Sequence, residues 1–237
     1  SGNAGDGIHI TGTGTTGNTV LGNYIGTNAA GLADRGNSLN GVRIDSGASS
    51  NTIGGTTSTA RNIISGNDQD GGYISDVGTQ SNTIAGNYIG LDKDGDAAIG
   101  NTAEGVSIVA GAANNMIGGL TSASRNVISG NGSFGVYIAG SGTGNQVLSN
   151  YIGTNWDGTQ KRSNLDGILI EGSASHTIGQ AGAGNLISGN TYFGIIVDGA
   201  GAVGNAIYAN SIGTNAAGTA ALSNDGDGIL IRNGATN

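Results

Sequence analysis

Acidic side chains alternate around one glycine in the middle of this 237-residue chain, in the run Asp92, Asp94 and Asp96. Carboxylates with this spacing open the loops that bind Ca²⁺ in EF-hand proteins. Such a loop would carry a glutamate at its twelfth position, where this chain has Ala103. Three of the four equivalent segments also lack the acidic set, so a solvated turn is favoured over a Ca²⁺ site. Ca²⁺ is the one cofactor that the sequence suggests.

A second arrangement places carboxylates after neighbouring strands. Asp45, Glu171 and Asp198 each follow an apolar strand-like segment, and the last two belong to successive copies of it. Strand spacing predicts that Glu171 and Asp198 lie about 5 to 7 Å apart, within the range of about 5 to 9 Å that paired glycosidase carboxylates require. No aromatic or basic residue accompanies the pair in sequence, so we assign no catalytic residue.

Two histidines and three aromatic residues complete the side chains that could bind or react. We expect His9 and His176 to be solvated surface residues, because they fall in different strand columns five turns apart. Tyr73, Tyr137 and Trp156 are predicted to be exposed and could stack on sugar rings. Isolated exposed aromatic residues are also normal on protein surfaces, so carbohydrate binding at these positions stays an alternative.

Short strands must position all of these residues, and three such segments recur along the chain. The first has two apolar residues around a variable one, so the outer pair faces one way and the middle residue the other. It occurs at residues 8–10, 42–44, 72–74, 106–108, 136–138, 168–170, 195–197 and 229–231. The second is marked by Val20, Ile53, Ile84, Ile117, Val147, Ile178 and Ile207.

An asparagine two residues before an isoleucine marks the third segment. This column comprises Asn23, Asn62, Asn87, Asn126, Asn150, Asn185 and Asn210. Its intervals alternate between long and short (39, 25, 39, 24, 35 and 25 residues), which indicates insertions at two different corners in alternate turns. Because the asparagine shares a strand face with the isoleucine, we predict an internal ladder of stacked amides that satisfies the corner backbone.

These columns predict an all-β fold, a single-stranded parallel β-helix of about eight turns with three strands per turn. Stacking each turn on the next pairs the strands in parallel and buries a continuous aliphatic column. The 49 glycines argue against a helical solenoid, because glycine costs about 1 kcal/mol at each helical position. We expect residues 1–237 to form one domain. Both ends match the middle of the repeat, which predicts a fragment of a longer array.

Composition excludes several partners. The net charge is −8 and only eight residues are Lys or Arg, so we expect no nucleic-acid partner. No apolar run approaches the roughly 20 residues of a membrane helix, so we expect no membrane insertion.

Unpaired strand edges at the end turns predict that the isolated chain associates end to end with further copies.

Four strings carry a family resemblance: Asn-Thr-Ile-Gly-Gly at 51–55, Arg-Asn-Val-Ile-Ser-Gly-Asn at 125–131, Gly-Asn-Tyr-Ile-Gly-Thr at 22–27 and Asp-Gly-Ile-Leu-Ile at 166–170. With them the chain resembles right-handed parallel β-helix repeat proteins of the pectate-lyase-like superfamily, particularly the long repetitive secreted and surface proteins of bacteria. The resemblance implies right-handed coiling, an asparagine ladder, an extracellular or cell-surface location, and either polysaccharide-related or adhesive and stalk roles. The lyases' clustered Ca²⁺ ligands with a basic residue, and the hydrolases' Gly-His-Gly string, have no counterpart here.

The sequence therefore predicts a non-enzymatic structural module, a rigid spacer in a secreted or surface-displayed bacterial protein. The alternative is a carbohydrate-binding or polysaccharide-modifying, lyase-like β-helix with a polysaccharide as its partner. An active face would interrupt the repeat with local, nonrepeating His, Lys, Arg and Asp residues. This sequence interrupts its repeat very little, which favours the first interpretation.

Overall fold

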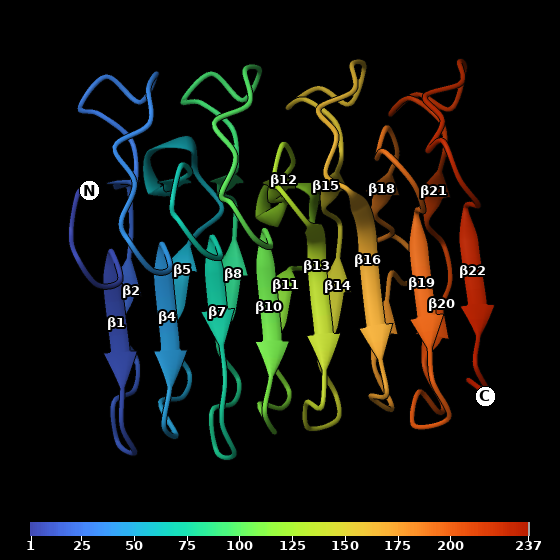
Figure 1. The fold of residues 1–237 in the computed structure, drawn as a ribbon, viewed down its shortest axis with the longest axis horizontal. Helices are drawn as coiled ribbons and strands as arrows, with labels where there is room; N and C mark the ends of the chain where they lie inside the picture. The colour runs from blue at the N-terminus through green and yellow to red at the C-terminus, as the bar shows by residue number, and fades with distance from the viewer. Residues whose placement is uncertain (237) are drawn as a thin grey trace.

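The chain folds as a parallel β-solenoid of about seven turns with three strands per turn, described for residues 1–236 in a computed structural model (Figure 1). The first sheet contains β1 (Ile8–Thr11), β4 (Val42–Asp45), β7 (Gly72–Ile74), β10 (Val106–Val109), β13 (Phe134–Ala139), β16 (Asp166–Glu171), β19 (Ile195–Asp198) and β22 (Ile229–Arg232). These strands lie side by side in chain order along the long axis of the molecule.

Two further seven-stranded sheets complete each turn. The second contains β2 (Thr19–Val20), β5 (Thr52–Gly54), β8 (Thr83–Ala85), β11 (Met116–Gly118), β14 (Gln146–Leu148), β17 (Thr177–Ile178) and β20 (Ala206–Ile207). The third contains β3 (Tyr24–Ile25), β6 (Ile63–Ile64), β9 (Tyr88–Ile89), β12 (Val127–Ile128), β15 (Tyr151–Ile152), β18 (Leu186–Ile187) and β21 (Ser211–Ile212). Both sheets are parallel, so the predicted all-β parallel solenoid with three strands per turn is confirmed, with about seven turns where the sequence predicts about eight.

The three apolar columns pair in the register that the sequence predicts. Ile10 pairs with Ile44 in the first sheet, Ile53 with Ile84 in the second, and Ile64 with Ile89 in the third. Their side chains meet in one continuous core of Ile and Val with a few Ala residues, and most of them are fully buried. Since no two-residue strand is stable alone, this stacking of turns supplies the stability of every strand.

Glycine is required where the chain turns close to its neighbour. Gly90, directly after β9, has a φ of +90°, and a Cβ there would lie 2.2 Å from the Ser129 carbonyl oxygen. Gly105, directly before β10, leaves room for Ile128, whose Cγ2 would lie 2.3 Å from an added Cβ. Both positions recur from turn to turn, which accounts for much of the glycine content.

The predicted asparagine ladder is present at the corner between the second and third sheets. Each Nδ2 donates to the Oδ1 of the asparagine in the next turn, at 2.9 to 3.1 Å, from Asn23 through to Asn210. The same Oδ1 also accepts the backbone N–H of the preceding rung, as between Asn62 and Asn87 at 3.1 Å. The amide of Asn87 further donates to the Ile53 carbonyl, so the ladder satisfies backbone groups that the corner leaves unpaired.

Two more ladders occupy the other corners. The corner between the third and first sheets carries Asn3, Asn37, Asn67, Asn101, Asn131, Asn164, Asn190 and Asn224, linked at 2.7 to 3.1 Å. The corner between the first and second sheets carries Asn18, Asn51, Asn82, Asn115 and Asn145, linked at 2.9 to 3.3 Å, with Asn205 beyond a break. The sequence analysis identified only the first of the three.

Insertions alternate between two corners, as the uneven asparagine spacing predicts. The long excursions between the third and first sheets each close with an antiparallel bridge: Thr27 with Asp34, Leu91 with Ala98, Thr154 with Lys161, and Thr214 with Ala221. They also touch one another along the axis, because the N–H of Lys93 donates to the Gly31 carbonyl at 2.9 Å. Two of the other insertions form short 3₁₀ helices, η1 (Ser58–Ala60) and η2 (Ser122–Ser124). Neither helix in residues 1–236 has the length and apolar character to cross a membrane.

The ladder predicts a graded loss of stability on substitution. Asn87→Ala removes a buried rung. The backbone N–H and side-chain amide of Asn62 then lose their shared acceptor, and the Ile53 carbonyl and Asn126 Oδ1 each lose one donor, which should lower the free energy of unfolding by on the order of 3 kcal/mol. Asn23→Ala removes an exposed end rung and should lower it by less than about 1 kcal/mol. Urea unfolding measures both free energies. Equal losses of stability at the two positions would contradict a ladder whose interior rungs are buried and whose end rung is exposed.

Candidate functional site

A shallow groove of about 450 Å³ lies on the outer face of the first sheet, over β7, β10 and β13. Carboxyl, amide, hydroxyl and aromatic side chains meet in it, including Gln69, Asp70, Tyr73, Glu104 and Tyr137. Two of the predicted carbohydrate-binding residues, Tyr73 and Tyr137, therefore share one surface depression.

The strand register sets the distance between the two tyrosines. Tyr73 and Tyr137 both pair with Ser107, one from each side, so they flank a small buried residue and stand about two strand spacings, or 10 Å, apart. Each ring already has one partner, since the Arg43 guanidinium lies 5.7 Å from the Tyr73 ring centroid and Phe134 stacks on Tyr137 at 5.6 Å. These contacts restrict the orientation of both rings on the sheet.

Two carboxyl groups line the groove near the beginning of β7 and β10. Asp70 and Glu104 stand at equivalent positions before β7 and β10, and the Glu104 N–H donates to Asp70 Oδ1 at 3.1 Å. Burial and a side-chain hydrogen bond with Glu104 raise the pKa of Asp70 to about 7, against the opposing effect of Ser107. Asp70 can therefore hold a proton near neutral pH. The sequence analysis missed this pair, although both residues stand directly before the glycine that opens their strand.

A glycosidase holds two carboxyl groups apart. Retaining enzymes separate them by about 5 Å and inverting enzymes by more, to admit the sugar or a water molecule. Asp70 and Glu104 lie close enough to interact, since Glu104 contributes to the raised pKa of Asp70. We assign no catalytic role to this pair.

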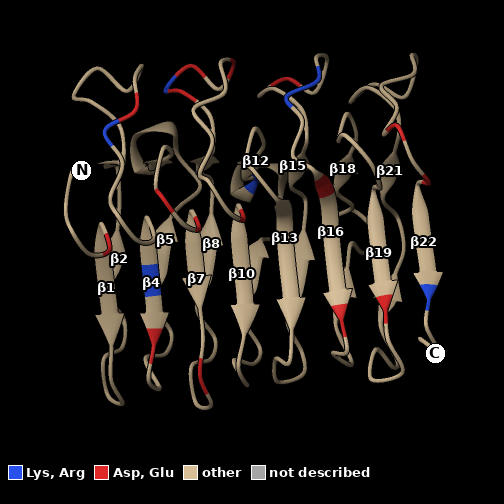
Figure 2. Cartoon of the chain, viewed as in Figure 1, with Lys and Arg blue, Asp and Glu red and all other residues tan. Residues whose placement is uncertain are grey.

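The predicted pair Glu171 and Asp198 lies in register on β16 and β19, but its members bond to different partners. Glu171 accepts a hydrogen bond of 2.6 Å from the Tyr137 hydroxyl, and burial together with this bond raises the pKa of Tyr137 to about 12. Asp198 pairs with Arg232 at 2.7 Å. Figure 2 shows acidic residues at the carboxyl ends of β4, β16 and β19, as the sequence predicts.

Asp45, at the end of β4, is buried beneath two basic side chains of the outer face. Its Oδ2 lies 3.0 Å from the Nε2 of His9 and also accepts a hydrogen bond from Arg43. Burial would raise the pKa of Asp45, but hydrogen bonds from Thr11, His9 and Arg43 lower it to about 2. His9 itself is 42% exposed, in agreement with the expected surface position.

The three aspartates of the predicted Ca²⁺ segment have separate protein partners. Asp92 Oδ1 accepts the N–H groups of Asp96 and Ala97, Asp94 pairs with Lys93 at 2.6 Å, and Asp96 pairs with Arg162 at 3.0 Å. The structure thus favours a turn at this position, and a Ca²⁺ site there stays a prediction.

Asn155 and Asn215 accept turn N–H groups in their own excursions as Asp92 does, so Asp92 acts as a turn residue. In residues 1–236 no group of three or more His, Cys, Asp or Glu side chains is arranged to hold a metal ion.

Trp156 lies apart from the two tyrosines. It is half exposed, and it lines a smaller pocket of about 190 Å³ over the third sheet, together with Arg61 and Arg125. The three predicted carbohydrate-binding residues therefore do not form one platform.

The expectation that His176 is a solvated surface residue is wrong. His176 is only 1% exposed and occupies a rung of the ladder between the first and second sheets, where other turns have asparagine. Its Nε2 lies 2.9 Å from Ser173 Oγ and 3.1 Å from Ser141 Oγ, while its Nδ1 has no partner in the described chain. Burial lowers the pKa of His176 to about 4.

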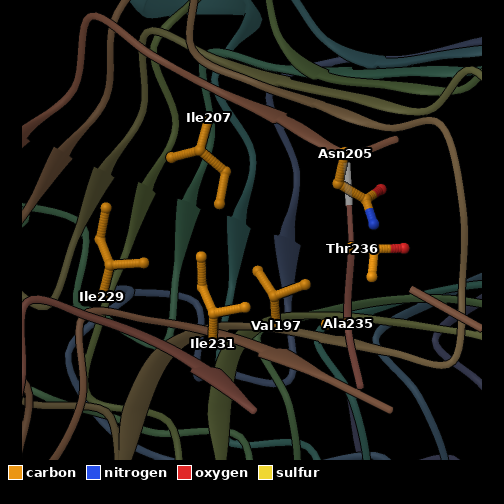
Figure 3. Close-up of a pocket in the computed structure, with 7 residues that line it drawn as sticks. All are labelled: Val197, Asn205, Ile207, Ile229, Ile231, Ala235 and Thr236. Atoms are coloured by element: carbon orange, nitrogen blue, oxygen red, sulfur yellow. The ribbon is translucent and has the colours of Figure 1, made fainter. Parts of the chain in front are cut away.

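A cavity of about 260 Å³ opens at the C-terminal end of the core (Figure 3). Ile207, Ile229 and Ile231 line it, and they continue the apolar columns of the core. This cavity is the open end of the apolar core at the last described turn of the solenoid.

Comparison of the chain with protein-family models, with curated proteins and with solved structures gives no match. Functional conclusions therefore rest on the geometry of the groove, the ladders and the outer faces.

Replacing His176 by the residue of the other rungs should stabilise the protein. His176→Asn restores an amide that can accept from Asn145 and donate to Asn205, so the free energy of unfolding should rise. In the wild type the unfolded state gains a proton near pH 6.5 and the folded state only near pH 4. Stability should therefore fall by roughly 3 kcal/mol as the pH falls through this window, and the variant should lack this loss.

Chemical unfolding at several pH values measures both effects. His9→Asn makes the same chemical change at an exposed strand position and should retain the acid-dependent loss. A His176→Asn variant with unchanged stability and pH dependence would refute the assignment of His176 to the ladder.

Proposed function

We propose that the chain is a structural module, a rigid spacer whose function depends on its persistent shape. The observation that supports this most is the continuity of the repeat, because two asparagine ladders and three strand registers run without interruption from the first turn to the last. Each turn is bonded to both neighbours at all three sheets. Bending the rod would require breaking these bonds together.

The finer parts of this proposal come from the family resemblance and from chain geometry. We propose right-handed coiling, because parallel strands joined by a crossover follow that hand in about 98% of cases. A secreted or bacterial cell-surface location and membership of the pectate-lyase-like superfamily are part of the same proposal. The repeated strings at 51–55 and 125–131 support them.

Self-association of the chain is a further part of the proposal. The apolar end face at Ile207, Ile229 and Ile231 could be covered by another turn of the same kind, supplied by a second copy stacked end to end.

Rigidity is measurable because the chain contains no cysteine of its own. Spin labels at Thr13→Cys and Ala200→Cys would occupy one corner column, six strand spacings or roughly 29 Å apart along the axis. A spacer predicts one narrow distance distribution near this value, since both sites are exposed and the stack between them is continuous. A broad or multi-peaked distribution by pulsed electron resonance would contradict a rigid spacer.

Carbohydrate binding at the groove is a second candidate function. It is favoured by the juxtaposition of Tyr73 and Tyr137 with the carboxyl pair Asp70 and Glu104 and with Gln69. Two fixed rings about 10 Å apart can stack on a sugar chain while the carboxyl and amide groups bond its hydroxyls.

A panel of uncharged hexasaccharides, including cellohexaose and xylohexaose, tests this candidate by isothermal titration calorimetry. We expect Tyr73→Ala and Tyr137→Ala each to weaken binding at least tenfold, because each removes one stacking surface. Tyr208→Ala is the matched control, since Tyr208 is half exposed on another face. Absence of binding by the wild type, or equal weakening by all three variants, would eliminate the groove as a saccharide site.

A further inference from the structure

Two arginines on the outer face of the third sheet lack the carboxylate partners that most basic residues of this chain have. Arg43, Lys93, Lys161, Arg162 and Arg232 each lie within 2.5 to 3.0 Å of an Asp oxygen. Arg61 and Arg125 make no ion pair with any described residue, although the chain carries an excess of negative charge. Their guanidinium charges are therefore uncompensated within residues 1–236.

The protein holds both guanidinium groups in a fixed orientation. Arg61 lies over the Tyr88 ring at 4.0 Å, and Arg125 lies over the Tyr151 ring at 3.8 Å. Each also donates from Nε to a backbone carbonyl, Arg61 to Gly86 at 3.2 Å and Arg125 to Ser149 at 3.3 Å. Stacking occupies the face of a guanidinium and leaves its edge free. Apart from a side-chain hydrogen bond between Arg61 and the Tyr88 hydroxyl, the Nη groups of the two arginines make no hydrogen bond with a described residue.

These free edges meet in one groove with a hydroxyl-rich lining. Arg61 and Arg125 both line the pocket of about 190 Å³, together with Thr56, Thr57, Ser122 and Trp156, and no acidic residue is among its lining. A second pocket of about 210 Å³ continues from it, since both contain Ser58 and Arg61, and it adds Tyr24 and Lys93. We call these two joined pockets the arginine groove.

The repeat fixes the spacing of the two guanidinium groups along the axis. Arg61 precedes β6 and Arg125 precedes β12, and these strands pair with opposite sides of β9. Two strand spacings separate them, or about 10 Å. A single small oxyanion cannot be held by both forks at this distance, whereas a chain bearing several oxyanions can engage each fork in two parallel hydrogen bonds.

We propose that the arginine groove binds a linear oligoanion, whose carboxylate, sulfate or phosphate groups engage Arg61 and Arg125 about 10 Å apart. The ligand lies along the solenoid axis between the 3₁₀ insertions on one side and the excursions on the other. Its uncharged parts contact Trp156 and the threonine and serine hydroxyls. This site is separate from the saccharide groove over the first sheet and adds a binding activity to the structural module.

Trp156 allows a test on the unmodified protein, because it is the chain's sole tryptophan and lies in the groove. Dextran sulfate oligosaccharides, linear polyphosphate, unsulfated dextran and sodium sulfate serve as probes in a fluorescence titration. We expect dextran sulfate or polyphosphate, or both, to change the Trp156 signal with an affinity that falls as salt increases. Which of the two binds more tightly identifies the source of the oxyanions. Unsulfated dextran should not bind, and sodium sulfate should bind at least a hundredfold more weakly.

Substitutions then assign the site. Arg61→Ala and Arg125→Ala should each weaken oligoanion binding at least tenfold, and Arg61→Lys should restore little, because lysine keeps the charge but loses the planar fork. Arg35→Ala is the matched control, since Arg35 is exposed, also lacks a carboxylate partner and lies outside the groove. It should leave the affinity within twofold of the wild type.

Several results would overturn the proposal. The proposal is wrong if the Trp156 fluorescence responds to neither oligoanion, or if sodium sulfate binds as tightly as the oligoanions do. It is also wrong if Arg35→Ala weakens oligoanion binding as much as Arg61→Ala and Arg125→Ala do. If an alanine variant does not fold, as judged by circular dichroism, the affinity of the Arg61→Lys variant and the salt dependence of wild-type binding still test the proposal. Persistence of full affinity in a folded Arg61→Lys variant would also refute a guanidinium-specific site.

Discussion

The need to satisfy backbone groups at the corners is the constraint on which the rest of the structure depends. A strand of two or three residues leaves a corner after every few peptide groups, and the core beside it consists of apolar side chains that cannot bond these groups. Asparagine resolves this because its side chain carries one acceptor and one amino group, which can repeat from turn to turn at the strand spacing. Aspartate could accept but not donate in such a row. The buried His176 interrupts the row, because its Nε2 bonds to Ser141 and Ser173 and its Nδ1 has no partner in the described chain.

The ladders in turn determine what the outer surface can do. Because the inner side of each strand and all three corners are committed to stacking, variable residues remain only on outward strand positions, in the excursions and in the 3₁₀ insertions. These are the places where the structure departs from strict repetition. Asp70 and Glu104 interrupt one face with neighbouring carboxyl groups, and Arg61 and Arg125 interrupt another with guanidinium groups that form no ion pair. The binding functions proposed for these two faces would be added to a scaffold whose interior stays constant.

Most of the architecture could be predicted from the sequence, because period and register are both visible in the apolar columns. The spacing that identified the ladder at Asn23 also marks a second ladder, since Asn51 stands two residues before Ile53 and Asn82 two before Ile84. The same signal assigns His176 to a buried rung, which the expectation of a surface position does not take into account. His176 stands two residues before Ile178, in the position of a rung.

The candidate sites were harder to predict than the fold. Tyr73 and Tyr137 share a groove because their strands are separated by a single strand of the sheet, which the column alignment gives directly. Trp156 lies in an excursion, whose direction no periodic pattern specifies, and it faces a different pocket. The stacking of Arg61 on Tyr88 depends on side chains of neighbouring turns 27 positions apart, and no local motif reveals such a contact. The contacts of the outer-face side chains therefore cannot be predicted from the repeat alone.

Hydrogen exchange of the asparagine side-chain amides tests the central claim most directly, because only a continuous internal ladder protects them. The account predicts that the amide protons of interior rungs such as Asn62, Asn87 and Asn126 exchange as slowly as the backbone amides of the adjoining strands. The exposed amide of Gln69 provides the unprotected reference in the same spectrum. Exchange of the interior asparagine amides at the rate of Gln69 would contradict the ladders and the fold that depends on them.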